Sequence, residues 1–213
     1  MKSRSTSLSA LVITAALGGL LLAPAVHAAT AEYDVSVSTS ALVGNPSGPF
    51  SLDFQFNDGA GTGDNNNTAS VSGFVFNGGL ATGSPTLSGG ATGSLAAGLH
   101  FNDSSALNEA YQGFTPGSTL TFHVSLTLNV APGSAPDLFS FGVLDSSLAN
   151  IPTTGFGDSL FTVEIGASGA TFATGSSLSP SVVVNVTAVP EPGVWATATG
   201  ALLIGFGVWR RRR

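Results

Sequence analysis

The feature that most constrains the fold is a strict alternation of apolar and polar residues in the middle of the chain. In TLTFHVSLTLNV, residues 119–130, every second residue from Leu120 to Val130 is apolar. A period of two places successive side chains on opposite faces of a strand, and six apolar positions in phase indicate a strand with one buried face. FSLDFQFN, residues 50–57, alternates in the same way, with Phe and Leu in the buried phase. Both segments are predicted to be half-buried β-strands.

Shorter stretches of the same kind lie along the rest of the chain. Weaker alternation marks residues 32–39, 138–144, 159–165 and 181–188, with further segments near 69–76, 93–101 and 169–173. The connections, such as NPSGP, NGG, TPGS and GASG, are rich in residues that favour tight turns. Eight or nine short strands predict an all-β chain of two packed antiparallel sheets. The predicted architecture is a jelly-roll-like β-sandwich, with a small barrel as the alternative. Only DSSALNEAYQ, around Ser104 to Gln112, favours a short helix, with serines available to cap it.

The charges are distributed unevenly. Residues 29–188 hold eleven of the twelve acids and no Lys or Arg, which gives this stretch a net charge near −11. Nucleic acid is excluded as a partner of this body, because phosphate binding requires cationic side chains. The chain has no cysteine, so no disulfide supports the fold and the hydrophobic core must do so alone.

The first 28 residues have the three parts of a secretory signal peptide. Lys2 and Arg4 form the positive region, residues 8–22 form the apolar region, and small residues follow Pro24. Cleavage by signal peptidase is predicted between Ala28 and Ala29. An uncleaved membrane helix is the alternative.

The last residues have the composition of a membrane-spanning segment. Residues 194–209 carry no charge, and Trp195 and Trp209 bracket them, as is typical of the two membrane interfaces. Four arginines follow, Arg210, Arg211, Arg212 and Arg213, and such a cluster is predicted to stay on the cytoplasmic side. The body would then lie outside the inner membrane.

Pro190, Glu191 and Pro192 precede this segment directly. Together, the Pro-Glu-Pro box, the apolar segment and the arginine cluster resemble the PEP-CTERM sorting signal. The resemblance covers residues 189–213 and implies recognition and removal of the tail by an exosortase, a membrane-embedded enzyme of Gram-negative bacteria. It also implies an inner-membrane intermediate, followed by residence at the cell surface or in an exopolysaccharide-rich extracellular matrix, as in a biofilm. A permanent membrane anchor is the alternative. The chain is thus expected to comprise a signal peptide (1–28), a β-sandwich body (29–188) and a sorting signal (189–213). The body resembles all-β families that commonly lie between two such signals, and these families have no assigned biochemical activity.

One loop of the body has the composition of a calcium site. NDGAGTGDNNNT, residues 57–68, offers the hard oxygen ligands that calcium prefers, with Asp58, Asp64 and Asn66 as the candidate ligands. The loop departs from the EF-hand pattern, since it lacks the turn glycine and the closing glutamate. A solvated hairpin loop is the alternative, and no other cofactor is expected.

No catalytic pattern stands out. His123 falls in the polar phase of its strand and is predicted to face solvent, and neither it nor His100 has metal-ligand spacing. Glu32, Glu109 and Glu164 are the carboxylates from which a surface hydrolase would draw a pair. The sequence therefore predicts a non-enzymatic structural or adhesive protein. The alternative is a carbohydrate- or calcium-binding surface module.

Overall fold

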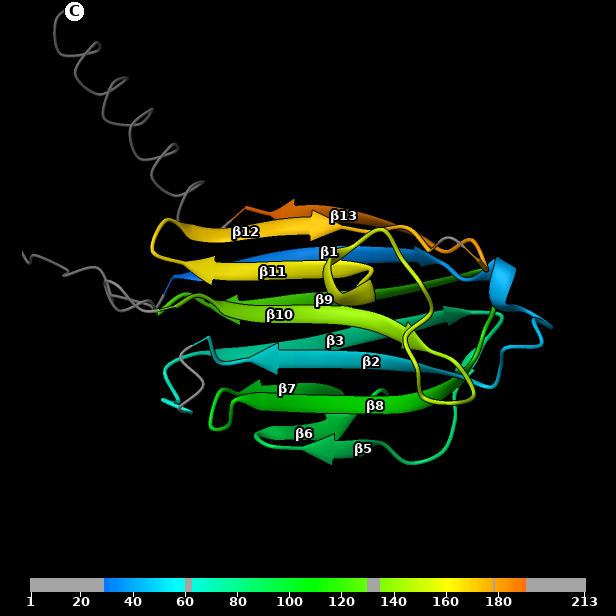
Figure 1. Cartoon of the computed structure of the whole chain (residues 1–213), viewed down its shortest axis with the longest axis horizontal. Helices are drawn as coiled ribbons and strands as arrows, with labels where there is room; N and C mark the ends of the chain where they lie inside the picture. The colour runs from blue at the N-terminus through cyan, green and yellow to red at the C-terminus, as the bar shows by residue number, and fades with distance from the viewer. Residues whose placement is uncertain (1–28, 60–62, 130–134, 178, 191–213) are drawn as a thin grey trace, which may run out of the picture.

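The structure is a computed structural model that describes residues 29–59, 63–129, 135–177 and 179–190. These residues form an all-β body of two antiparallel sheets (Figure 1). The first sheet, A, has the strand order β13 (Val183–Val189), β1 (Thr30–Ser38), β9 (Thr119–Thr127), β3 (Thr68–Asn77), β7 (Gly98–Asn102) and β6 (Ala91–Ser94). The second sheet, B, has the order β12 (Gly169–Thr174), β11 (Phe161–Gly166), β10 (Asp137–Leu144), β2 (Phe50–Asn57), β8 (Leu107–Thr115) and β4 (Leu80–Ala81), with β5 (Thr86–Ser88) also paired to β8. Two short 3-10 turns, η1 (Ser40–Leu42) and η2 (Phe156–Asp158), complete the described elements.

The two sheets pack face to face around a core rich in phenylalanine. Phe54 of β2 is fully buried, and its ring meets Phe122 of β9 at a centroid distance of 5.4 Å, nearly edge to face. The same ring lies 5.0 Å from Phe141 on the neighbouring strand β10 and 5.8 Å from Phe74 on β3. Aromatic pairs at these distances and angles stabilise a core beyond the burial of their area. The prediction of two packed antiparallel sheets is confirmed.

The alternation that predicted the two principal strands matches their burial. In β9 the side chains from Leu120 to Leu126 in the apolar phase are all buried, and those between them are half-exposed. In β2 the apolar phase is buried as well, but Asp53, in the polar phase, is buried too.

The helix predicted around Ser104 to Gln112 is wrong. Residues 107–115 form strand β8, the neighbour of β2 in sheet B. Its inward phase contains Asn108 and Gln112, both buried, so the apolar alternation that signals a strand is interrupted by amides. Asn108 Nδ2 donates to the Phe56 carbonyl at 2.9 Å, and Gln112 Oε1 accepts from the Leu95 amide at 2.9 Å. These hydrogen bonds satisfy the buried amides and stabilise a strand that hydrophobicity alone did not reveal.

The strand count is also higher than predicted. The described residues contain thirteen strands, where eight or nine were expected. The segment near 93–101, for example, is a hairpin of β6 and β7. Gly93 and Gly98 flank its turn with φ of 97° and 95°, conformations that glycine adopts without the steric cost of a side chain.

The first and last strands of the body lie side by side. β13 pairs antiparallel with β1 along the whole length of β13, from Val183 opposite Ser38 to Val189 opposite Glu32. The start of β1 also lies opposite the end of β9, and the backbone amide of Leu128 donates to the Ala29 carbonyl at 2.8 Å. This end of the sandwich, where β1 begins and β13 ends, is called the terminal pole below.

Several of the residues singled out in the sequence lie outside the part of the chain that the structure describes. The signal peptide with Ala28, together with Glu191, Pro192 and Arg210 to Arg213, lies outside the described residues, whereas Ala29 and Pro190 lie within them. Within the described ranges no helix is long and apolar enough to cross a membrane.

Candidate functional site

The loops at the terminal pole bring acidic and amide side chains together from three connections. Asp58, Asp64, Asn66 and Asn67 belong to the β2–β3 connection, Asp103 follows β7, and Asp137 begins β10. These six residues are called the acidic loop cluster. Sequence reasoning found the first three of them through their local density of oxygen ligands. It missed Asp103 and Asp137, which tertiary structure alone places here.

Asn67 connects the three loops. Its side chain is 1% exposed, and its Nδ2 donates to Asp137 Oδ2 at 2.7 Å and to the Asn129 carbonyl at 2.9 Å. Its backbone amide donates to Asp103 Oδ2 at 2.9 Å. Its Oδ1 accepts from the backbone amide of Asn129 at 2.7 Å. One buried amide side chain therefore fixes the β2–β3 loop against both neighbouring loops.

The predicted ligands have different partners within the cluster. Asp58 is buried, and its Oδ2 accepts from the backbone amide of Gly63, which closes the loop on itself. Asp64 is exposed, and its Oδ2 accepts from Asn66 Nδ2 at 2.8 Å. Asp64 and Asn66 are thus in contact, whereas Asp58 serves the loop backbone.

Two oxygens of the cluster are buried without a hydrogen-bond partner among the described residues, Asp103 Oδ1 and Asn66 Oδ1. Asp103 is 0% exposed, and burial raises the pKa of its carboxyl, with a further increase from Asp137 and Asp64. Within the described ranges, no group of three or more His, Cys, Asp or Glu side chains has a geometry that would hold a metal ion. Any cation bound here would therefore need amide or water oxygens beside the carboxylates.

A separate pair of acidic residues, Asp53 and Glu109, lies on the outer face of sheet B. Asp53 is 4% exposed, and its Oδ2 accepts from Gln55 Nε2 at 2.8 Å. The same Nε2 donates to Glu109 Oε1 on β8 at 3.2 Å. Burial raises the pKa of the Asp53 carboxyl to about 7, and the nearby Glu109 carboxylate adds to the increase. Sequence reasoning expected an exposed side chain at position 53.

The carboxylates predicted for a surface hydrolase are not brought together. Glu32 lies on β1 in sheet A, while Glu164 is exposed on β11 and Glu109 lies on β8 in sheet B. Glu109 has Asp53 as its acidic neighbour instead. The three predicted carboxylates therefore form no catalytic pair with one another.

A shallow polar hollow of about 340 Å³ lies on the outer face of sheet A. His123, in the polar phase as predicted, is one-third exposed, with Nδ1 2.9 Å from Asp34 Oδ1 and Nε2 4.0 Å from Glu32 Oε2. Thr121, Asn185 and Thr187 line the same hollow, and Gly73 of β3 contributes no side chain to fill it. Hydroxyl, amide, imidazole and carboxylate groups thus face one small space. His100, on β7, lies outside this hollow and is exposed.

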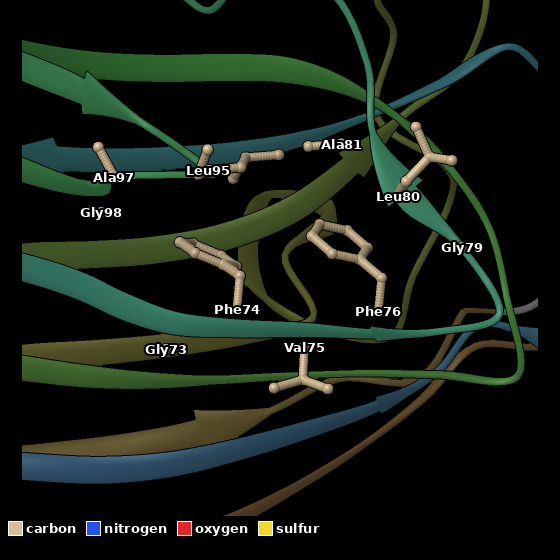
Figure 2. Close-up of a pocket in the computed structure, with 11 residues that line it drawn as sticks. Gly73, Phe74, Val75, Phe76, Gly79, Leu80, Ala81, Leu95, Ala97 and Gly98 are labelled. Carbon is tan, nitrogen blue, oxygen red and sulfur yellow. The ribbon is translucent and has the colours of Figure 1, made fainter.

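An apolar groove of about 560 Å³ lies on the other side of β3, toward the interior of the sandwich (Figure 2). Phe74 and Phe76 point into it from β3, and their rings stack at a centroid distance of 6.4 Å. Leu80 and the Leu95–Gly98 turn form the opposite wall. β7 pairs with one edge of β3 only up to Val71, so on that edge no described strand of sheet A continues beside Phe74 and Phe76, whereas β9 pairs with the other edge of β3 as far as Asn77.

No family model, no curated protein and no solved structure matches this chain.

Proposed function

We propose that the chain is an exported structural or adhesive protein, sorted through its C-terminal PEP-CTERM signal to the cell surface or the exopolysaccharide matrix of a Gram-negative bacterium. The observation that carries the proposal is the order of three segments, Pro190–Glu191–Pro192, the uncharged residues 194–209 and the arginines 210–213. The first 28 residues, with the composition of a cleaved signal peptide, supply the export step.

The position of the body's ends supports this proposal. β13 ends at Val189, and the exposed Pro190 follows at once, so no long linker separates the sandwich from the Pro-Glu-Pro box. β1 begins beside the end of β13. The two proposed processing points, after Ala28 and at the box, therefore adjoin the same pole. The remainder of the sandwich then extends away from the membrane while the tail still holds it.

The tail is proposed to act through lipid electrostatics. Arginine side chains are costly to move into hydrocarbon, so four of them stop the chain while residues 194–209 span the bilayer as a helix. The box is then held on the outer side for an exosortase-type enzyme. After the tail is removed, the proposed product is a non-enzymatic body of jelly-roll type, whose acidic surface favours hydration and discourages self-association.

Alanine substitution of Pro190, Glu191 and Pro192 together tests the sorting proposal. In a host that carries the processing enzyme, the triple variant is expected to accumulate in the inner membrane with its tail intact. The parent should lose the tail and reach the extracellular fraction. Ser147→Ala, in an exposed loop of the body, is the control and should be processed as the parent is. Mass spectrometry of each fraction reports both cut sites, and a triple variant that is cut and released like the parent contradicts the proposal.

A second candidate function is carbohydrate binding, favoured by the polar hollow around His123. Hydroxyl, amide and carboxylate groups are suited to the many hydrogen bonds of a sugar, since they offer both donors and acceptors. Asn185→Ala is expected to abolish retardation of the protein in affinity electrophoresis against the producer's own polysaccharide, because it removes one such group from the hollow. His100→Ala, outside the hollow, is the control and should leave the retardation unchanged. Equal mobility of the parent with and without polysaccharide contradicts this candidate.

A further inference from the structure

We propose that the acidic loop cluster binds one divalent cation of the calcium class, with oxygens of Asp103, Asn66 and Asp64 as its protein ligands. This inference is independent of the sorting proposal, because it concerns only the body. It differs from the sequence expectation in placing Asp103 at the centre of the site and in excluding Asp58 from the ligands.

The buried carboxylate oxygens of the cluster differ in their hydrogen-bond partners. Both carboxylate oxygens of Asp137 have donors, Gly59 N at 3.0 Å and Asn67 Nδ2 at 2.7 Å. Asp103 has one such donor, on Oδ2, and its Oδ1 is buried without any among the described residues. A buried oxygen without a partner is costly and uncommon in native structures, and a bound ion is one of its ordinary explanations.

The acidic loop cluster concentrates negative charge. Asp58, Asp103 and Asp137 are each 6% exposed or less, and residues 29–190 contain no Lys or Arg to neutralise them. Asp103 interacts electrostatically with Asp137 and Asp64, so the carboxylates are close enough to repel one another. Buried charges are ordinarily paired with an opposite charge or coordinate a metal. Since the body supplies no Lys or Arg, and His100 and His123 lie on strands outside the cluster, a cation from solution is the group that fits.

Hydrogen bonds within the β2–β3 loop indicate which residues are the ligands. Asn66 Oδ1 is the other oxygen of the cluster that is buried without a partner among the described residues. Asn66 donates to both carboxylate oxygens of Asp64, from Nδ2 to Oδ2 at 2.8 Å and from its backbone amide to Oδ1 at 3.3 Å. Unlike Asp137, Asp64 is exposed, so its oxygens keep lone pairs open to a cation. The next residue, Asn67, donates its backbone amide to Asp103 Oδ2. One short run of chain therefore links Asp64 and Asn66 to Asp103. Asp58 and Asp137 hold the loop backbone through the amides of Gly63 and Gly59, which positions the ligands without using these two carboxylates.

The chemistry of these ligands selects the cation. All three supply hard oxygens, and the cluster has neither histidine nor cysteine, which disfavours zinc. Calcium accepts six to eight oxygens in a flexible geometry, and water completes its shell on the exposed side at Asp64. Two carboxylates and one amide form a weakly charged site, so a dissociation constant of about 10⁻⁴ to 10⁻³ M is expected, as in extracellular calcium modules.

Calorimetric titration of the full-length chain in mild detergent, after treatment with EDTA, tests the proposal. Calcium is expected to bind with a stoichiometry near one and to raise the melting temperature by a few degrees at about 10 mM. Asp103→Asn retains the shape of the side chain and an acceptor for the Asn67 amide. It should weaken calcium binding about tenfold or more, and Asp64→Asn, at the exposed side, should weaken it as well.

Glu164→Gln is the matched control, because it removes one negative charge from an exposed site on β11. It should leave calcium binding unchanged. The proposal is overturned if calcium at 20 mM gives neither binding heat nor a shift in melting temperature. It is also overturned if both Asp103→Asn and Asp64→Asn keep the parental shift, or if NaCl of equal ionic strength reproduces it, since both results indicate general screening of the acidic surface. If Asp103→Asn does not fold, Asp64→Asn decides the outcome alone.

Discussion

Phe54→Ala is expected to destabilise the body by about 4 kcal/mol, the largest loss that we predict for a single core substitution. The Phe54 ring is fully buried and contacts aromatic rings from both sheets, Phe122 and Phe74 in sheet A and Phe141 beside it in sheet B. Truncation to alanine removes this buried area and leaves a cavity between the sheets, a change that typically costs 3–5 kcal/mol. Since small proteins are stable by only about 5–15 kcal/mol, much of the total stability would be lost.

Urea unfolding followed by circular dichroism measures this effect. Phe156→Ala is the matched control, because the Phe156 side chain is 77% exposed and its truncation should change the free energy of unfolding by less than about 0.5 kcal/mol. A loss below about 1 kcal/mol for Phe54→Ala would contradict the packing described for the core.

The second large effect is a fall in stability as the pH rises from about 4 to about 7, caused by Asp53. Burial, with Glu109 nearby, raises the pKa of the Asp53 carboxyl to about 7 in the folded body, while an aspartate in an unfolded chain has a pKa near 3.9. Between these two values the folded state binds more protons than the unfolded state, so the free energy of unfolding decreases with pH. A difference of about three pKa units corresponds to roughly 4 kcal/mol, fully present below pH 4 and lost above pH 7.

Asp53→Asn should remove this part of the pH dependence. The amide retains an oxygen that accepts from Gln55 and supplies a donor toward Glu109, so stability near pH 4 should change little. Near pH 8 the variant should be more stable than the parent by up to roughly 4 kcal/mol. Chemical denaturation at several pH values measures the difference between the two profiles. Glu164→Gln, at an exposed carboxylate, is expected to keep the parental profile, and identical profiles for the parent and Asp53→Asn would refute the prediction.

Sequence periodicity predicted the strands whose buried phase is apolar. β9 and β2 were evident because Leu, Phe and Val recur at every second position. β8 was missed because Asn108 and Gln112 occupy its buried phase, and their hydrogen-bond partners belong to other segments of the chain. A local pattern cannot reveal such partners, since tertiary pairing supplies them.

The burial of Asp53 has a similar explanation. Its strand position predicted exposure, but the long connection from β10 to β11 crosses the outer face of sheet B (Figure 1). A Cβ at Gly142, the residue opposite Asp53, would lie 2.9 Å from Asn150 Oδ1 of this connection. The covering segment lies almost a hundred residues beyond Asp53 in the sequence, so local alternation carries no sign of it.

The acidic loop cluster was found only in part for the same reason. Asp58, Asp64 and Asn66 are close in sequence, and their composition was sufficient to mark them. Asp103 joins them because β7 pairs with β3, with Asn102 opposite Thr68, and Asp137 joins them because β10 pairs with β2. Strand pairing therefore decides the membership of the cluster.

The pairing of β1 with β13 means that sheet A can finish folding only after the last residues of the body are available. β1 pairs with a strand about 150 residues later in the sequence, and until that strand is in place β1 has β9 on one side only. Such distant pairing slows folding, because much of the chain must be ordered first. Proteolysis within Val183–Val189 would remove the strand that covers the edge of β1. The unpaired backbone groups of β1 could then pair with strands of other molecules. A cut at Pro190 or beyond it leaves β13 and every other described strand intact.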